Sequence, residues 1–296
     1  MFKRVGLLIL TNIAIVFVLS IVLNLLGVQP YLAKQGINYQ SLLVFAAIFG
    51  FGGAFISLLM SKFIAKMSFS IKLINQPQSP DEIWLINTIQ RLVKQAKIGM
   101  PEVGIYQSPE PNAFATGASR NKALVAVSTG LLQAMTRDEV EGVLAHEISH
   151  IVNGDMVTLT LIQGVLNTFV IFFARIAAYA AAQFFSRDDD GGMSQGIYFL
   201  MVILFQIVFG ILATVVVMWF SRKREFRADA GSAKLVGKTK MIAALQKLAQ
   251  CYDMPADPRG ASIAAFKISA HSKVGALFAS HPPLAERIKA LNTERV

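Results

Sequence analysis

The chain contains little charge and almost no cysteine. Only 16% of its 296 residues are Asp, Glu, Lys or Arg, against about 25% in soluble domains, and 54% are hydrophobic. This balance excludes a disordered chain and a simple soluble enzyme, and it favours an integral membrane protein. The single cysteine, Cys251, cannot form an intrachain disulfide, which excludes an oxidised secreted scaffold.

Acidic residues are scarcer than basic ones. The 18 Asp and Glu stand against 28 Lys and Arg, which gives a formal net charge of +10. Such an excess is typical either of nucleic-acid binding or of the basic flanks of membrane segments. Because the basic residues gather beside apolar segments, we expect a lipid bilayer and no nucleic acid as a partner.

Four segments without any charged residue organise the chain. They are 5–27, 41–61, 156–174 and 196–220, between 19 and 25 residues long. A helix needs about 20 residues to cross the hydrocarbon core, so the sequence predicts four transmembrane helices in two hairpins, 1–61 and 156–220. Lys and Arg lie before the first segment and after the second and fourth, so both termini and the intervening domain are expected in the cytoplasm.

The remaining residues, 62–155 and 221–296, are enough for one domain assembled from two halves. We expect helices over 81–97 and 136–152, strands over 103–106, 113–116 and 124–128, and a helical second half. The predicted fold class is a predominantly α-helical integral membrane protein with a cytoplasmic α+β domain that contains a small β-sheet.

A short motif on the expected helix 136–152 carries the chemistry. Residues 146–150 read His-Glu-Ile-Ser-His, and Thr136 with Glu139 forms a capping box at the helix start. His146 and His150 are one turn apart on the same face, so both imidazoles can bind one metal ion. Glu147, one step along the helix, can hold and deprotonate a water molecule there.

A catalytic zinc site needs a third protein ligand besides the two histidines. An antiparallel hairpin of 156–174 and 196–220 would return the chain beside the zinc helix near residues 221–230. In this stretch Glu225 is the only glutamate, and Asp229 follows one turn later. We predict Glu225 as the third ligand and Asp229 as an acceptor that orients an imidazole. The alternative is a basic juxtamembrane helix whose acids only form i,i+4 pairs.

Several motifs together resemble the HtpX family of bacterial membrane-bound heat-shock zinc metalloproteases. They lie at residues 146–155, 221–229, 112–117 and 280–283, and the resemblance covers essentially the whole chain. The family belongs to the glutamate-zincins, with CAAX prenyl proteases as relatives. The resemblance implies a zincin-like domain with one Zn²⁺ held by His146, His150 and Glu225, and Glu147 as the base. It also implies quality control of misfolded or damaged proteins in the bacterial inner membrane, as part of a stress response.

The resemblance extends to weaker positions. It implies that His281, before two prolines, contacts the tetrahedral intermediate; the residues alone allow a surface histidine equally well. Residues 112–116 could form the edge strand that pairs with an extended substrate, which makes Asn112, Ala113 and Phe114 candidate substrate-binding residues. Without the resemblance, the same residues predict an ordinary short strand. His271 is expected on a helix surface. Arg287, in an expected helix after the double proline, could reach the site, but a solvated helix face is the default expectation.

The leading hypothesis is therefore a zinc-dependent endopeptidase that cleaves membrane proteins at cytoplasmic segments. The alternative is a catalytically inactive membrane zinc-binding scaffold, which would not need Glu147. A channel or transporter has less support, because the apolar segments contain no intramembrane acid. The sequence does not decide between a monomer and a homo-oligomer.

Overall fold

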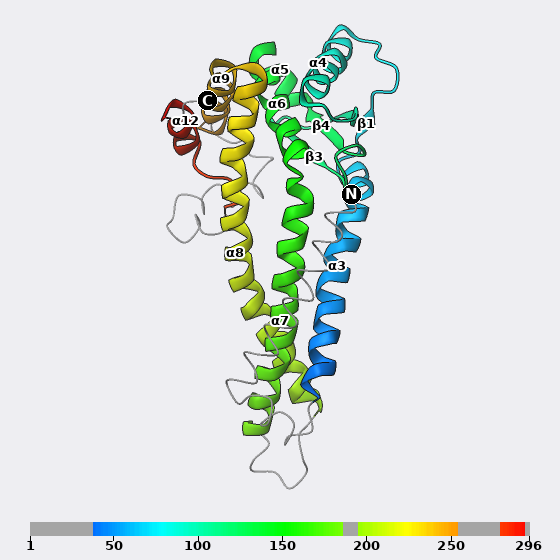
Figure 1. The fold of residues 1–296 in the computed structure, drawn as a ribbon, viewed down its shortest axis with the longest axis vertical. Helices are drawn as coiled ribbons and strands as arrows, with labels where there is room; N and C mark the ends of the chain where they lie inside the picture. Colours follow the sequence, from blue (N-terminus) through cyan, green and yellow to red (C-terminus); the bar gives the residue numbers. More distant parts are fainter. Residues whose placement is uncertain (1–37, 186–194, 254–278, 294–296) are drawn as a thin grey trace. The chain divides into compact units, whose positions relative to one another are not determined.

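The computed structural model describes residues 38–185, 195–253 and 279–293 (Figure 1). Its elements are α3 (Tyr39–Ser68), β1 (Lys72–Leu73), α4 (Pro80–Ala96), β2 (Glu102–Tyr106), β3 (Ala113–Thr116), β4 (Leu124–Ser128), α5 (Thr129–Ala134), α6 (Arg137–Asn153), α7 (Asp155–Phe185), α8 (Gln195–Val236), α9 (Lys238–Asp253) and α12 (Leu284–Thr293). The described residues divide into two compact units, one of residues 38–57, 159–185 and 195–217, the other of residues 58–158, 218–253 and 279–293.

Three of the described helices are long and apolar enough to cross a membrane. They are Tyr39–Ser68, Asp155–Phe184 and Gln195–Val236, with 30, 30 and 42 residues. The predicted segments 41–61, 156–174 and 196–220 lie inside them, whereas the segment 5–27 lies outside the described residues. A predominantly helical membrane protein with a small sheet is therefore confirmed as the fold class.

Close packing of small residues joins α3 and α7 within the first unit. A Cβ atom added at Gly50 would lie 2.6 Å from the backbone nitrogen of Thr168, so the two helices touch at this glycine. Leu43, Ala46 and Phe172 form a buried cluster beside it. Such contacts are typical of membrane helices, where lipid tails are as apolar as leucine and close backbone approach provides the attraction.

A four-stranded mixed sheet forms the frame of the second unit. Its strand order is β1-β2-β4-β3, with β2 and β4 parallel and the two outer pairs antiparallel. One face packs on α4 and α6 through a cluster of buried aliphatic side chains, among them Leu85, Ile89, Leu92, Val125, Val127, Leu144 and Ile148. β3 stands at one end of the strand order, with a pairing partner on one side only among the described strands.

The helix that carries the His-Glu-Ile-Ser-His motif is bounded by local signals. Thr136 accepts a hydrogen bond from the Glu139 backbone, and the Glu139 side chain accepts one from the Thr136 backbone. Gly154 ends α6 in the left-handed conformation, with φ of 67°, which glycine adopts without strain. The capping box and the stop after Asn153 confirm the bounds that the sequence predicts for this helix.

Candidate metal centre

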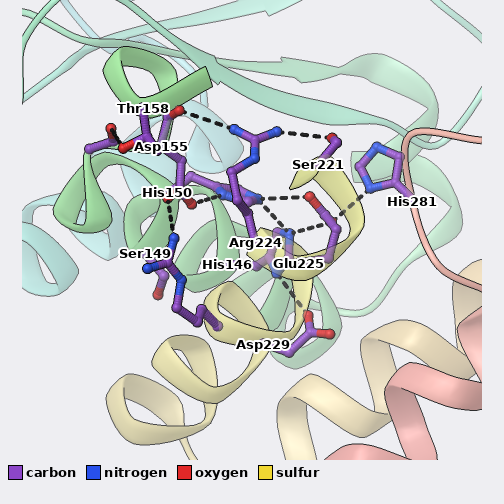
Figure 2. Close-up of polar contacts among 12 residues, drawn as sticks. His146, Ser149, His150, Asp155, Thr158, Ser221, Arg224, Glu225, Asp229 and His281 are labelled. Atoms are coloured by element: carbon purple, nitrogen blue, oxygen red, sulfur yellow. Dashed lines mark hydrogen bonds and ion pairs between the residues drawn. The ribbon is translucent and has the colours of Figure 1, made fainter. Parts of the chain in front are cut away.

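The two histidines of α6 point toward the same place. Their Nε2 atoms lie 3.1 Å apart, and both side chains are largely buried (Figure 2). Each ring is turned by a buried carboxylate. Nδ1 of His146 donates to Asp229 at 2.9 Å, and Nδ1 of His150 donates to Asp155 at 2.7 Å. With these carboxylates holding a proton on each Nδ1, both Nε2 atoms are the nitrogens that would offer a lone pair to a bound cation.

Glu225 on α8 completes the cluster. Its Oε2 lies 3.4 Å from Nε2 of His146 and its Oε1 lies 3.4 Å from Nε2 of His150. Its side chain is only 2% exposed. The ligand atoms of these three residues all lie within 4.8 Å of one another, which makes the cluster able to hold one metal ion.

A close approach between α8 and α6 sets the position of Glu225. A Cβ at Gly231 would lie 2.6 Å from Oγ of Ser149, and Oγ of Ser232 donates to the Gly142 carbonyl at 2.9 Å. Ser149 lies between the two histidines in sequence. The two helices therefore touch less than two turns from Glu225. This contact sets the distance between the Glu225 carboxylate and the histidines of α6.

Electrostatics inside the cluster favour a cation. Burial would raise the pKa of Glu225, but hydrogen bonds from His146, His150 and His281 outweigh it and hold that pKa far below its usual range. Burial would lower the pKa of His150, but its bonds to Asp155 and Glu225 raise it to about 10. The buried carboxylates thus stabilise positive charge at the point where the two imidazoles and Glu225 meet.

Asp155 is a partner that the sequence analysis missed. It is fully buried at the start of α7, and its Oδ1 accepts from Arg227 at 3.2 Å while its Oδ2 accepts from His150. Its backbone carbonyl accepts from Arg224 at 3.2 Å. The sequence did contain a signal for this contact. Asp155 directly follows the Gly154 helix stop, so its carboxylate begins a new helix within reach of the last turn of α6, which carries His150.

The expectation that Arg287 lies on a solvated helix face is wrong. Its side chain is 7% exposed, and it donates to both carboxylate oxygens of Asp229, at 2.8 Å and 2.6 Å. Its NH1 also lies 3.6 Å from Oε2 of Glu225. The guanidinium compensates the negative charge of Asp229, which buried alone would be costly. Only tertiary packing brings Arg287 to Asp229, and no local pattern around residue 287 indicates it.

The other predicted site residues fall into two groups. His281 lies at the metal cluster, where its Nδ1 donates to Oε2 of Glu225 at 2.7 Å while 61% of its side chain stays exposed. Glu147 is half-buried on α6, next to His146 in the sequence. Asn112 is exposed just before β3, and Ala113 and Phe114 lie on β3 itself, which packs against α6. His271 lies outside the described residues.

Comparison with known proteins shows to which family the chain belongs. The sequence profile of Peptidase family M48 matches residues 79–295, which include the whole metal cluster. The chain belongs to Peptidase family M48. Proteins named Protease HtpX from Tolumonas auensis and Protease HtpX homolog from Nitrosomonas europaea are 57% and 55% identical to it, each over 99% of this chain and 100% of the relative.

The crystal structure of S. mikatae Ste24p has the same fold. It superposes with a TM-score of 0.64 at 19% identity, covering 96% of this chain and 66% of that one. Together with the apolar helices, the M48 membership makes this chain a membrane-bound metalloprotease with protein substrates. Nothing in these matches favours an inactive scaffold.

Proposed function

We propose that the chain is a zinc endopeptidase in which His146, His150 and Glu225 hold the ion. One observation carries the proposal. Ligand atoms about 2.0–2.1 Å from a tetrahedral zinc lie about 3.3 Å from each other. The two Nε2 atoms here lie 3.1 Å apart, close to that spacing, and each lies 3.4 Å from a different carboxylate oxygen of Glu225. The two-nitrogen, one-carboxylate donor set is also that of catalytic rather than structural zinc sites, because it leaves a fourth position open.

In the proposed mechanism Glu147 moves the proton. Zinc, when bound, polarises the scissile carbonyl and makes the attacking water more acidic. Glu147 accepts the proton of that water and passes it to the leaving amine. Asp155 and Asp229 keep the imidazoles in the tautomer that presents Nε2, and Arg287 holds Asp229 in place. His281, when protonated, can donate from its second nitrogen to the oxyanion while Nδ1 stays on Glu225.

The proposed substrates are cytoplasmic segments of misfolded or damaged membrane proteins. Apolar helices anchor the chain in a bilayer, and the unpaired side of β3 offers backbone groups to an extended substrate, with Asn112, Ala113 and Phe114 beside it. An extended segment is available in a protein that has lost its fold. The proposed location is the bacterial inner membrane, with both termini and the active site in the cytoplasm, as the distribution of Lys and Arg supports.

The first experiment separates metal binding from catalysis. Protein purified in detergent is assayed for zinc content and for casein cleavage, wild type beside Glu147→Gln. We expect both proteins to contain about one zinc per chain and the variant to lose nearly all turnover, because its amide cannot accept the proton. Near wild-type cleavage by the variant would refute Glu147 as the base. A wild-type protein that binds no zinc would refute the proposed metal.

A second experiment tests the orientation. Cys251 is the only cysteine and lies half-buried on α9. A maleimide that cannot cross the inner membrane should leave Cys251 unlabelled in intact spheroplasts and label it in inverted vesicles. Labelling in spheroplasts would place the protease domain on the outer side and would remove cytoplasmic segments from the substrate class.

A further inference from the structure

Three aromatic rings gather on the face of the sheet that turns away from α6. Phe69, Tyr106 and Phe114 have ring centroids 5.2, 5.2 and 5.8 Å apart. Tyr106 is buried, whereas 47% of Phe69 is exposed. The rings are tilted against one another at 46–54°, and aromatic pairs at such distances attract each other by about 0.5–1.5 kcal/mol beyond their buried area. The cluster therefore presents one fixed, partly exposed ring next to the edge strand.

The register of the sheet shows on which face Phe114 lies. Ala113 and Ala115 pack against the core that includes α6, so Phe114 between them points to the opposite face. Phe114 pairs with Ala126, which pairs in turn with Gly104. These two residues are too small to cover that face, and a side chain at Gly104 would collide with Ile71. The segment that follows α3 thus covers the sheet up to Phe114.

The position of Phe69 is fixed by the way α3 ends. The backbone nitrogen of Ile71 donates to the Lys66 carbonyl and that of Ser70 to the Met67 carbonyl, which is the Schellman pattern. Ser70 adopts a positive φ of 48° to allow it.

Two ion pairs tie the same turn of α3 to the sheet. Nζ of Lys62 and Nζ of Lys66 lie 2.9 and 2.6 Å from the carboxylate oxygens of Glu102 on β2. A helix cap and two ion pairs thus hold an exposed phenyl ring beside the strand edge, where a polar side chain would cost less.

We infer that Phe69 and Phe114 form a specificity subsite that receives one large apolar side chain of the substrate. The inference rests on the proposed function, because it requires an extended substrate beside β3. Alternate side chains of such a strand lie on one face, and the residue opposite Phe114 would have its Cβ about 4.5–5.5 Å from that of Phe114. On this face it meets the two phenyl rings, and its neighbours along the chain point the other way. The protease therefore selects an apolar side chain at one substrate position and tolerates others beside it.

The test is a set of quenched fluorogenic peptides. A single Phe, or in a parallel series a single Glu, replaces Ala at each successive position of an otherwise constant peptide, and kcat/KM is measured for each. Wild type should prefer Phe over Ala at one position by about 10-fold, the size expected of an apolar pocket, with the effect in KM rather than kcat. In Phe69→Leu most of this preference should remain.

Phe69→Lys should reverse the preference, whereas misfolding would only lower the activity on every peptide. At the same position its preference should change from Phe to Glu, because an ammonium group now lies where the ring was. Ile83→Ala, which removes an apolar side chain of similar exposure on α4, is the matched control and should keep the wild-type ratio.

The outcomes separate the inference from the function on which it rests. If wild type cleaves the peptides and Phe69→Lys keeps the wild-type preference for Phe, the subsite is refuted while the protease function stands. If zinc-loaded wild type cleaves none of the peptides nor casein, the proposed function fails and the subsite with it.

Discussion

The fully buried carboxylate of Asp155 accepts a hydrogen bond from Nδ1 of His150 at 2.7 Å, across the glycine that separates α6 from α7. The first residue of a membrane-type helix thus orients a side chain of the metal cluster. Asp229 on α8 does the same for His146. The two histidines are therefore held by acids from two different helices, and each acid has an arginine of its own: Arg227 for Asp155 and Arg287 for Asp229.

Loss of the Asp155 charge should weaken zinc binding without removing a ligand. Asp155→Asn leaves an amide that holds the imidazole less firmly, and we expect zinc affinity to fall about 10–100-fold. Affinity is measured by competition with a chelator of known strength. Asp138→Asn is the control, since Asp138 is exposed on the same helix α6 and pairs with Lys240 away from the metal cluster. Equal affinities in all three proteins would show that Asp155 has no part in orienting His150.

Removal of the third metal ligand, Glu225, should weaken zinc binding more than the loss of the Asp155 charge. Glu225→Ala leaves two histidines and should lose zinc during dialysis that wild type withstands, because two protein ligands do not complete a zinc site. Glu286→Ala removes an exposed glutamate on α12 and should retain the metal. Full zinc occupancy in Glu225→Ala would move the third ligand to another residue, with His281 the first to be tested.

Arg287 should contribute strongly to stability. Arg287→Met keeps an unbranched apolar stem but leaves Asp229 as a buried, unpaired charge, and we expect a loss of about 3–5 kcal/mol in the free energy of unfolding. Part of it should return in the double variant Arg287→Met/Asp229→Asn, which removes the unpaired charge. Lys289→Met, on the exposed face of α12, should change stability little. A single variant as stable as wild type in thermal unfolding would contradict the buried pair.

Zinc binding should depend on pH in a defined direction. Without metal the pKa of His150 is raised to about 10, so near neutral pH its ring is protonated on both nitrogens, and an ion must displace the proton from Nε2. The apparent zinc affinity should therefore increase as the pH rises through the neutral range towards that pKa, and binding should release protons. Calorimetry in two buffers of different ionisation enthalpy measures that release. An affinity that decreases over this range would contradict the raised pKa.

Local signals predicted more of the fold than of the site. The capping box at Thr136, the Gly154 stop and the Leu-Val-Ala-Val run of β4 depend only on neighbouring residues, and the structure has these elements at the expected places. Glu225 could be proposed because one glutamate lies where the chain returns. Asp155 and Arg287 were not proposed in their roles, because burial decides both. An acid after a helix stop and an arginine on a short amphipathic helix look alike in sequence whether they are exposed or enclosed.

The contact at Gly231 limits which residues the enzyme can tolerate at this position. No atom larger than hydrogen fits between residue 231 and Ser149, and the Ser149 hydroxyl is itself committed to the Ala145 carbonyl at 2.7 Å. A single added methyl group would act as a wedge between the ligand-bearing helices and lengthen the gap that Glu225 must bridge. Metal–ligand bonds tolerate only about 0.2 Å of error. Activity therefore depends on Gly231, which takes no part in the reaction but lets α6 and α8 approach closely enough for Glu225 to reach the metal.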